Sequence, residues 1–295
     1  MLNRPWPEEF CQVRGRFLAA QNWDQLGKAD APFALLGAPL DITTSFRSGT
    51  GQGPEAIRAA SQVLEDYSLE LDRDLNAQAF ADLGDLPLVP GDLVGSLELI
   101  EQAVAHLVAA GGRPFLLGGE HLVTLPVVRA LAAVYPDLAV LQFDAHADLR
   151  NHYLGWQLSH ATVMRRVAGI VGPAAVWQFG IRSADREEAA YGRAHTHLYP
   201  GERLLAGCQA ARQALANRPV YITIDIDVCD PGFAPGTGTP EPGGTSPGKL
   251  LRGLRALAGL SVVGLDLVEV CPPYDPSGIT AILAARLIRD CLLLF

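Results

Sequence analysis

The chain has 295 residues, of which 49% are hydrophobic and 19% are charged, and its formal net charge is -9. This acidic balance argues against a nucleic-acid-binding protein, which needs clustered positive charge to displace counterions from phosphates. It is compatible with a small cationic partner. A chain of this length buries a full core without disulfides or structural metals, so any metal ligands need a chemical explanation.

The cysteines and the N-terminal segment indicate a cellular compartment. The five cysteines are widely scattered and form no C-x-x-C pair, which is typical of reduced thiols. The first fifteen residues lack the apolar core of a signal peptide, and no apolar run is long enough to cross a bilayer. We therefore expect a cytoplasmic protein without a membrane partner.

Short runs that are apolar at consecutive positions predict buried parallel strands at 33–36, 114–117, 138–143, 175–179, 220–224 and 261–265. Helical stretches lie between them, at 54–61, 96–110, 122–134, 160–168, 204–216, 247–258 and 279–294. Because each parallel neighbour needs a crossover connection, this alternation predicts a three-layer α/β/α sandwich with a mainly parallel sheet. No linker or internal repeat divides the chain, so we expect a single domain over residues 1–295.

Function is expected just beyond the predicted strands, because ligands of such sheets bind at the carboxyl ends of the strands. The segment from Pro231 to Pro247 is rich in glycine and proline and too broken for a helix or strand. It is typical of a shaped loop that covers a site.

Three polar segments directly follow predicted strands. Asp144, His146 and Asp148 come after the run 138–143, and on extended backbone alternate side chains point the same way. Asp225 and Asp227 repeat this spacing after 220–224, whereas His121 follows 114–117 in the sequence GGEH. Taken singly, a D-x-D can be a solvated turn and His121 a hydrogen-bonded structural histidine. All three at strand ends predict a metal site, because clustered carboxylates repel one another unless cations lie between them.

The kind of ligand indicates the kind of metal. Carboxylate-rich ligation with a minority of imidazole suits manganese, or iron or magnesium, better than a tetrahedral zinc site. Six ligands exceed what one cation takes while leaving room for water and substrate. Two cations about 3.5 Å apart can hold a water molecule and lower its pKa toward neutrality. The pattern therefore predicts a hydrolase.

The motifs GGEH, FDAHAD, DIDVCDP and VEV resemble the ureohydrolase family, which includes arginase, agmatinase and guanidinobutyrase. The resemblance covers nearly the whole chain, from FALLGAP to the final helix. Segments such as SFRSGTGQGPEAIRAAS, SHATVMRR and DPGFAPGTGTPEPGG are of agmatinase type. The resemblance implies an arginase-like fold, two manganese ions per chain and a homo-oligomer, either a trimer or a hexamer.

The resemblance also implies residue roles. Asp148 would orient the attacking water and accept its proton, His160 would shuttle a proton, and Glu269 would grip the guanidinium group of a small cationic substrate. Asp144 and Asp225 would bridge the two cations. The full set of implied ligands is His121, Asp144, Asp148 and Asp225 for one manganese, with His146 and Asp227 completing the second.

Agmatine, hydrolysed to putrescine and urea, is the substrate that the resemblance favours. Arg150 favours instead a carboxylate tail, as in guanidinobutyrate or guanidinopropionate, if its guanidinium faces the pocket. Glu120 stands where relatives usually carry aspartate, so it could tilt His121 or weaken one metal site, and Trp156 lies in the segment expected to line the substrate tail. Two alternatives from other classes stay open: a deacetylase-like single-zinc amidohydrolase, and a catalytically silent family member that acts as a binding protein.

Overall fold

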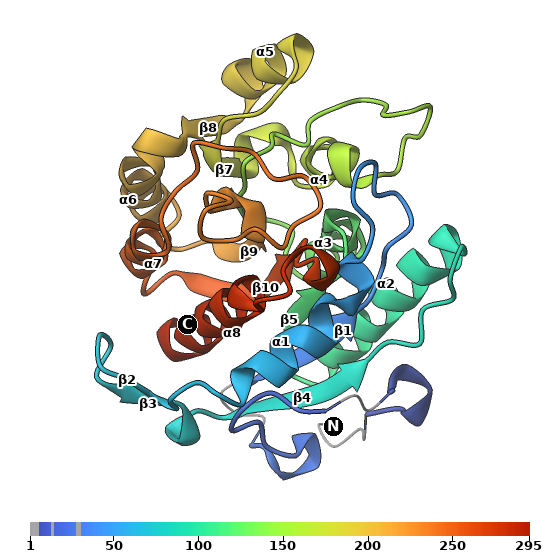
Figure 1. Cartoon of the computed structure of the whole chain (residues 1–295), viewed down its shortest axis with the longest axis vertical. Helices are drawn as coiled ribbons and strands as arrows, with labels where there is room; N and C mark the ends of the chain where they lie inside the picture. The colour runs from blue at the N-terminus through green and yellow to red at the C-terminus, as the bar shows by residue number, and fades with distance from the viewer. Residues whose placement is uncertain (1–5, 13–14, 28–30) are drawn as a thin grey trace.

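Within the described residues, eight strands form one central sheet, in which all neighbouring strands run parallel and the order is β4-β1-β5-β10-β9-β6-β7-β8 (Figure 1). The structure is a computed structural model that describes residues 6–12, 15–27 and 31–295. The strands are β1 (Phe33–Ala38), β4 (Phe80–Asp85), β5 (Arg113–Gly118), β6 (Ala139–Phe143), β7 (Val176–Ile181), β8 (His197–Pro200), β9 (Pro219–Asp225) and β10 (Ser261–Val268).

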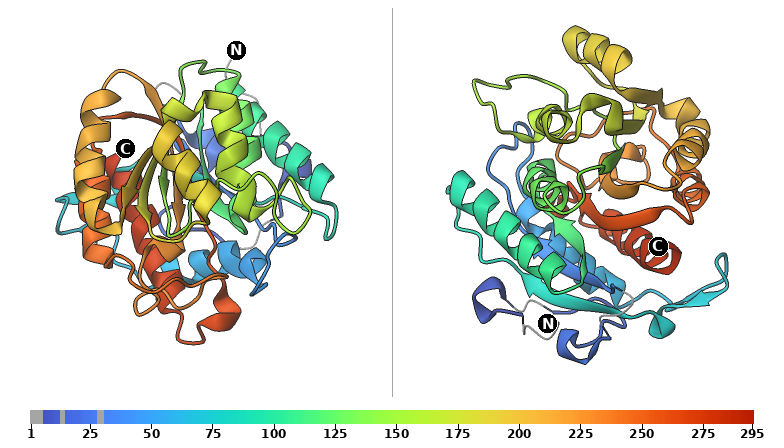
Figure 2. Two further views of the ribbon diagram at one scale, coloured as in Figure 1. Left: turned by 90° about the horizontal axis from the view of Figure 1, so that it is seen from above. Right: turned by 180° about the vertical axis from the view of Figure 1, so that it is seen from behind.

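Helices cover both faces of this sheet (Figure 2). Phe33 and Leu35 of β1 belong to one core cluster, and Ala34 and Leu36 belong to the other, because successive side chains of a strand point to opposite faces. The first cluster includes residues of α1 (Gly53–Ser61), α6 (Leu204–Ala214), α7 (Pro247–Ala256) and α8 (Ile279–Leu294). The second includes residues of α2 (Leu93–Ala109), α3 (Thr124–Ala132) and α4 (Val163–Val171). The three-layer α/β/α prediction is confirmed.

Among the strands and α-helices of the described residues, five were not predicted from the sequence. Strand β4 contains two buried acids, Asp82 and Asp85, which are ion-paired to the buried Arg58 and interrupt the apolar run. Strand β8 is a short edge strand whose side chains are partly exposed. Beside it lies the polar helix α5 (Arg186–His195), and a small hairpin joins β2 (Tyr67–Ser68) to β3 (Arg73–Asp74) (Figure 1).

The centre of the sheet brings together the strand ends that carry the polar segments. In the sheet, the neighbouring strands are β5, β10, β9 and β6, in that order. In the sequence, β6 is the strand that follows β5. Val268 at the end of β10 is in register with Asp225 of β9, and Phe143 at the end of β6 is in register with Ile224. The segments that follow these strands therefore leave the sheet at one edge. Within the described part of the chain, no helix has the length and apolar character needed to span a bilayer.

Candidate functional site

His121 enters the site through a tight turn after β5. The turn follows Gly118 and Gly119, and a Cβ atom at Gly119 would lie 1.9 Å from the carbonyl oxygen of Leu40. Only glycine permits this approach of two backbone segments. The chain then forms the short 3-10 helix η5 (His121–Val123) ahead of α3, which fixes the position of the His121 side chain.

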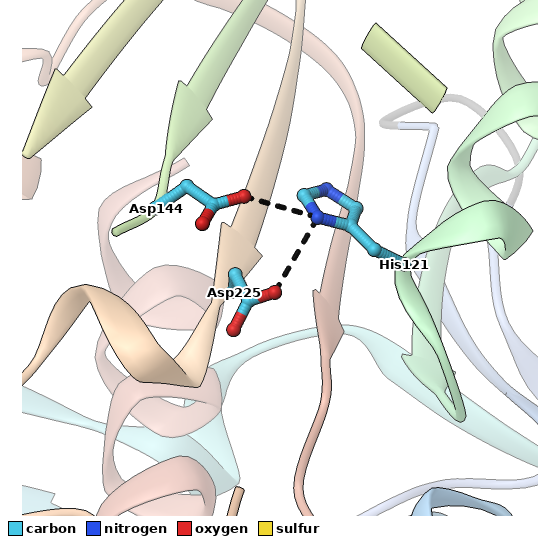
Figure 3. A group of neighbouring side chains, drawn as sticks. All are labelled: His121, Asp144 and Asp225. Atoms are coloured by element: carbon cyan, nitrogen blue, oxygen red, sulfur yellow. Dashed lines mark ion pairs between the residues drawn. The ribbon is translucent and has the colours of Figure 1, made fainter. Parts of the chain in front are cut away.

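Carboxylates from two further strand ends converge on His121. Its Nδ1 atom lies 3.1 Å from Oδ2 of Asp144, 3.1 Å from Oδ2 of Asp148 and 3.4 Å from Oδ2 of Asp225. Figure 3 shows Asp144 and Asp225 reaching His121 from the ends of separate strands. All four residues are buried. The three separate segments identified in the sequence therefore meet at one point.

A second group lies beside the first and shares Asp144 with it. Nδ1 of His146 is 2.9 Å from Oδ2 of Asp227 and 3.7 Å from Oδ1 of Asp144. The candidate ligand atoms within each group lie within 4.8 Å of one another. The two groups are His121, Asp144 and Asp225, and Asp144, His146 and Asp227. Two adjacent groups that share one carboxylate could hold two metal ions.

The electrostatics of this cluster fit divalent cations. His121 Nδ1 and Asp227 Oδ2 are buried and have no hydrogen-bond partner among the described residues. Burial and the charge of Asp144 raise the pKa of Asp148 to about 7. Burial, together with the charges of Asp227 and Asp144, raises the pKa of Asp225 well above its usual range. A nearby positive charge stabilises the ionised form of such carboxylates. Oxygen ligands combined with imidazole suit manganese-like ions.

Two strand residues orient the ligands. Nε2 of His121 is 2.9 Å from the hydroxyl of Thr223, which leaves Nδ1 directed at the carboxylates. The side-chain amide of Gln142 donates to Oδ2 of Asp144 over 2.7 Å. Neither residue was predicted from the sequence. Each is a polar residue inside an apolar strand, and this was a usable signal because a buried polar group needs a hydrogen-bond partner.

Asp148 and Glu269 both have left-handed backbone conformations, with φ of +52° and +66°. Such values are uncommon for residues with side chains and often occur at functional sites. Oε1 of Glu269 accepts the backbone N–H of His121 over 2.7 Å. A Cβ atom at Gly238 would lie 3.2 Å from Oε2, so glycine leaves space beside that oxygen. Burial raises the pKa of Glu269 well above its usual range, and the carboxylate would therefore be stabilised by a facing cation.

His160 begins the 3-10 helix η6 (His160–Thr162). Its Nδ1 is 3.3 Å from the Thr43 hydroxyl, and its Nε2 is 3.3 Å from the Ser45 hydroxyl. Burial lowers the pKa of His160 to about 4, so the ring is neutral near neutral pH. Thr43 and Ser45 lie more than a hundred residues away in sequence. Ser45 begins the segment SFRSGTGQGPEAIRAAS, but no pattern placed either residue beside His160.

One cavity of about 200 Å³ joins the predicted site residues. His121, His146, Asp148, His160 and Glu269 line it, and Asp225 also contributes to its wall. Asp144 and Asp227 lie behind the lining side chains and contact them as described above. The structure thus brings all eight predicted residues into one site.

The outer wall of the cavity includes Arg150, Glu188 and Tyr153. Nε of Arg150 is 3.2 Å from Oε2 of the buried Glu188, and Nη1 is 3.8 Å from Oδ2 of Asp185. The Arg150 guanidinium also lies over the Tyr153 ring, with its carbon 4.8 Å from the ring centroid. Arg150 therefore borders the cavity, but its charge is already paired with carboxylates.

Glu120 and Trp156, two residues singled out in the sequence, have the following neighbours. The carboxylate of Glu120 does not hydrogen-bond the His121 ring, because Oε2 accepts the backbone N–H groups of Ile42 and Thr43 over 2.6 and 2.7 Å. The indole of Trp156 is 61% exposed and lines a separate groove with Leu154. Tyr153 lines both this groove and the cavity, so Trp156 lies beside the cavity wall.

Comparison with known proteins agrees with this geometry. The sequence model of the arginase family matches residues 31–294. An agmatinase from Halalkalibacterium halodurans is 46% identical over 88% of this chain and 90% of its own, and an agmatinase from Bacillus subtilis is 45% identical over 95% and 96%. The structure of proclavaminate amidino hydrolase from Streptomyces clavuligerus superposes with a TM-score of 0.87 at 32% identity, over 97% of this chain and 98% of that one. The chain therefore belongs to the arginase family of ureohydrolases.

Proposed function

We propose that this chain hydrolyses agmatine to putrescine and urea with two manganese ions as cofactors. The observation that carries the proposal is the pair of His–Asp groups that share Asp144 and open into the cavity beside Glu269. The 45–46% identity to agmatinases supports agmatine as the substrate.

The proposed metal ligands divide into two sets. One ion would be held by a histidine and three aspartates, and the other by a second histidine and an aspartate together with bridging carboxylates. When bound, the two cations would supply the positive charge that lowers the pKa of a water molecule toward neutrality. The proposed ligands are His121, Asp144, Asp148 and Asp225 for one ion, and His146 and Asp227 for the other, and Asp144 and Asp225 would contribute to both.

Glu269 is proposed to hold the substrate guanidinium. One of its carboxylate oxygens is fixed by the backbone of His121, and the other lies where Gly238 leaves space. A carboxylate and a guanidinium form planar, charge-assisted hydrogen bonds that fix the target carbon in the cavity. Because burial disfavours the charged carboxylate, a cationic partner stabilises it most.

Asp148 and His160 are proposed to move protons. Asp148 would orient the water that attacks the guanidinium carbon and accept its proton. The amine that departs is a poor leaving group unless it is protonated, so the proton must reach its nitrogen. Asp148, or His160 as a relay, would deliver it and so release urea and an amine.

The paired state of Arg150 supports a cationic tail over a carboxylate tail. A carboxylate-tailed substrate would need the guanidinium of Arg150, whose Nε lies 3.2 Å from Glu188. The deacetylase-like alternative assigns no role to His121 or Asp148, although both lie in the same cluster. We also propose that the chain forms a homo-oligomer, a trimer or hexamer, which light scattering would test.

The direct test compares three substrates on manganese-loaded protein under identical conditions: agmatine, arginine and 4-guanidinobutyrate. We expect urea from all substrates that turn over, with the highest kcat/KM for agmatine and putrescine as the second product. A higher kcat/KM for 4-guanidinobutyrate would reject agmatine as the substrate. No urea from any of the three would support a silent family member, and a single zinc per chain would support the deacetylase-like enzyme.

A further inference from the structure

Glu120 fixes the hydroxyl proton of Thr43. The Glu120 side chain is fully buried, and its Oε2 accepts the backbone N–H groups of Ile42 and Thr43. Its Oε1 accepts the hydroxyl of Thr43 over 2.5 Å. A threonine hydroxyl has one proton and two lone pairs. Since the proton is given to Glu120, Thr43 Oγ1 can act only as an acceptor toward its other neighbours.

Among the residues that the structure describes, the other two hydrogen-bond contacts of Thr43 Oγ1 are with His160. The backbone N–H of His160 donates to it over 3.0 Å, and Nδ1 of the His160 ring lies 3.3 Å away. An acceptor facing Nδ1 requires that Nδ1 carry the ring proton. The neutral ring then has its lone pair on Nε2.

The opposite edge of the ring fits this assignment. Nε2 of His160 lies 3.3 Å from Oγ of Ser45, which in turn accepts the hydroxyl of Tyr153 over 3.4 Å. Ser45 can therefore donate its own proton to Nε2. Ser45, Tyr153 and His160 all line the cavity that contains Asp148 and Glu269. In the other tautomer, Nδ1 and Thr43 Oγ1 would face each other as two acceptors.

We propose that Thr43, held by Glu120, is a positioning residue that keeps His160 in its Nδ1–H tautomer and so presents the Nε2 lone pair to the cavity. The inference rests on the proposed function, which gives that lone pair a use. In place of the Ser45 hydrogen bond, Nε2 accepts the proton that Asp148 takes from the attacking water. The imidazolium then gives this proton to the nitrogen of the departing amine. Burial keeps the ring neutral near neutral pH, so the two neutral tautomers are the states that compete.

The tautomer is read directly by long-range ¹H–¹⁵N NMR of protein labelled with ¹⁵N-histidine and loaded with magnesium, which is diamagnetic. The His160 signals are those missing from the His160→Ala spectrum, and Nε2 is the nitrogen that couples to both ring carbon-bound protons. We expect a pyridine-type shift for Nε2 and a pyrrole-type shift for Nδ1. The reverse pattern in the unmodified protein overturns the proposal without any variant and independently of whether urea is formed.

Two substitutions at Thr43 test the cause. Thr43→Val keeps the shape but removes the hydroxyl, and Thr43→Ser keeps the hydroxyl. For Thr43→Val we expect a mixed or Nε2–H tautomer, unchanged manganese content and a kcat lower by about 10- to 100-fold with little change in KM. Thr43→Ser should restore the tautomer and bring kcat to within about threefold of the unmodified enzyme.

A double variant separates positioning from general damage to the loop. In a His160→Ala background, Thr43→Val should lower kcat little further, because the residue that it positions is absent. A further loss as large as in the unmodified background would contradict the proposal, as would an unchanged Nδ1–H tautomer in Thr43→Val. If no guanidino compound yields urea while the NMR pattern is as expected, the proposed function fails and the tautomer assignment stands.

Discussion

Asp225→Asn should weaken metal binding and at the same time stabilise the metal-free protein. Asp225 is buried, its Oδ1 accepts the backbone N–H of Asp227 over 2.9 Å, and its Oδ2 faces Nδ1 of His121 at 3.4 Å. Asparagine has nearly the same shape and can keep the first contact. The substitution therefore removes one negative charge with little change in packing.

The expected loss of affinity follows from the charges. Four aspartates supply four negative charges, which two divalent cations would cancel. Two unit charges about 4 Å apart interact by about 4 kcal/mol at an effective dielectric constant of 20. Removing one partner of a buried charge pair typically costs about 3–5 kcal/mol. For at least one manganese ion, this corresponds to a dissociation constant weaker by roughly two to four orders of magnitude.

In the metal-free protein, Asp225→Asn should raise the stability of the fold. Burial and the charges of Asp227 and Asp144 hold the pKa of Asp225 well above its usual range, so the aspartate is unfavourable there without cations. Asparagine removes that cost, and we expect the melting temperature of the metal-free variant to rise by a few degrees, since about 1 kcal/mol shifts a chain of this size by roughly 2–4 °C.

Calorimetric titration with manganese, urea release and thermal unfolding in a chelator together measure these effects. Asp137→Asn is the matched control, because it removes the same charge from a side chain that is 73% exposed, and it should change none of the three. Full manganese content and turnover in Asp225→Asn would show that Asp225 is not a metal ligand. A lower melting temperature of the metal-free variant would show that the buried Asp225 carboxylate does not destabilise the metal-free fold.

Three further predictions concern the wall of the cavity and the metal cluster. His160→Ala should keep both manganese ions but lower kcat by about 10²- to 10⁴-fold, and unchanged turnover across a broad pH range would remove its relay role. Arg150→Gln should free the carboxylate of Glu188, which is then available to the cationic tail of agmatine. We expect KM for agmatine to fall by up to about fivefold, which is the effect of a partly exposed ion pair. A lower KM for 4-guanidinobutyrate would contradict a cationic tail. Metal-free protein should lose stability as pH rises, because the folded state binds more protons. Burial and Asp144 raise the pKa of Asp148 to about 7, so its contribution is lost between pH of about 4 and 7. Burial alone would lower the pKa of His146, but Asp227 and Asp144 raise it to about 12. The contribution of His146 to the free energy of unfolding is therefore lost from pH of about 6.5 upward. Melting temperatures in chelator at pH 5 and pH 8 check this, and a higher value at pH 8 would show the sign to be wrong.

The sequence predicted the parts of the fold in which apolar residues are continuous. The six apolar runs correspond to β1, β5, β6, β7, β9 and β10, all of which are buried on both faces. Strand β4 was missed because its buried acids are acceptable only beside Arg58, 24 and 27 residues away. No local pattern reports such a partner. Strand β8 was missed because an edge strand with partly exposed side chains lacks the apolar signal.

The metal cluster was predictable because its residues follow directly after predicted strands, and the topology of a parallel sheet gathers strand ends at one edge. The surroundings of His160 were not predictable in the same way. Thr43 and Ser45 reach it from a loop whose path depends on the buried carboxylate of Glu120. The contact of Glu120 with this loop was not predictable, because its partner Ile42 lies 78 residues away in the sequence.

We expect two cations to bind in the adjacent groups that share Asp144. Anomalous X-ray scattering at the manganese absorption edge, from crystals of manganese-loaded protein, would locate them. We expect two peaks per chain, one contacted by His121 and the other by His146, with Asp144 between them. A single peak, or manganese bound away from both histidines, would show that these groups do not form a two-metal site.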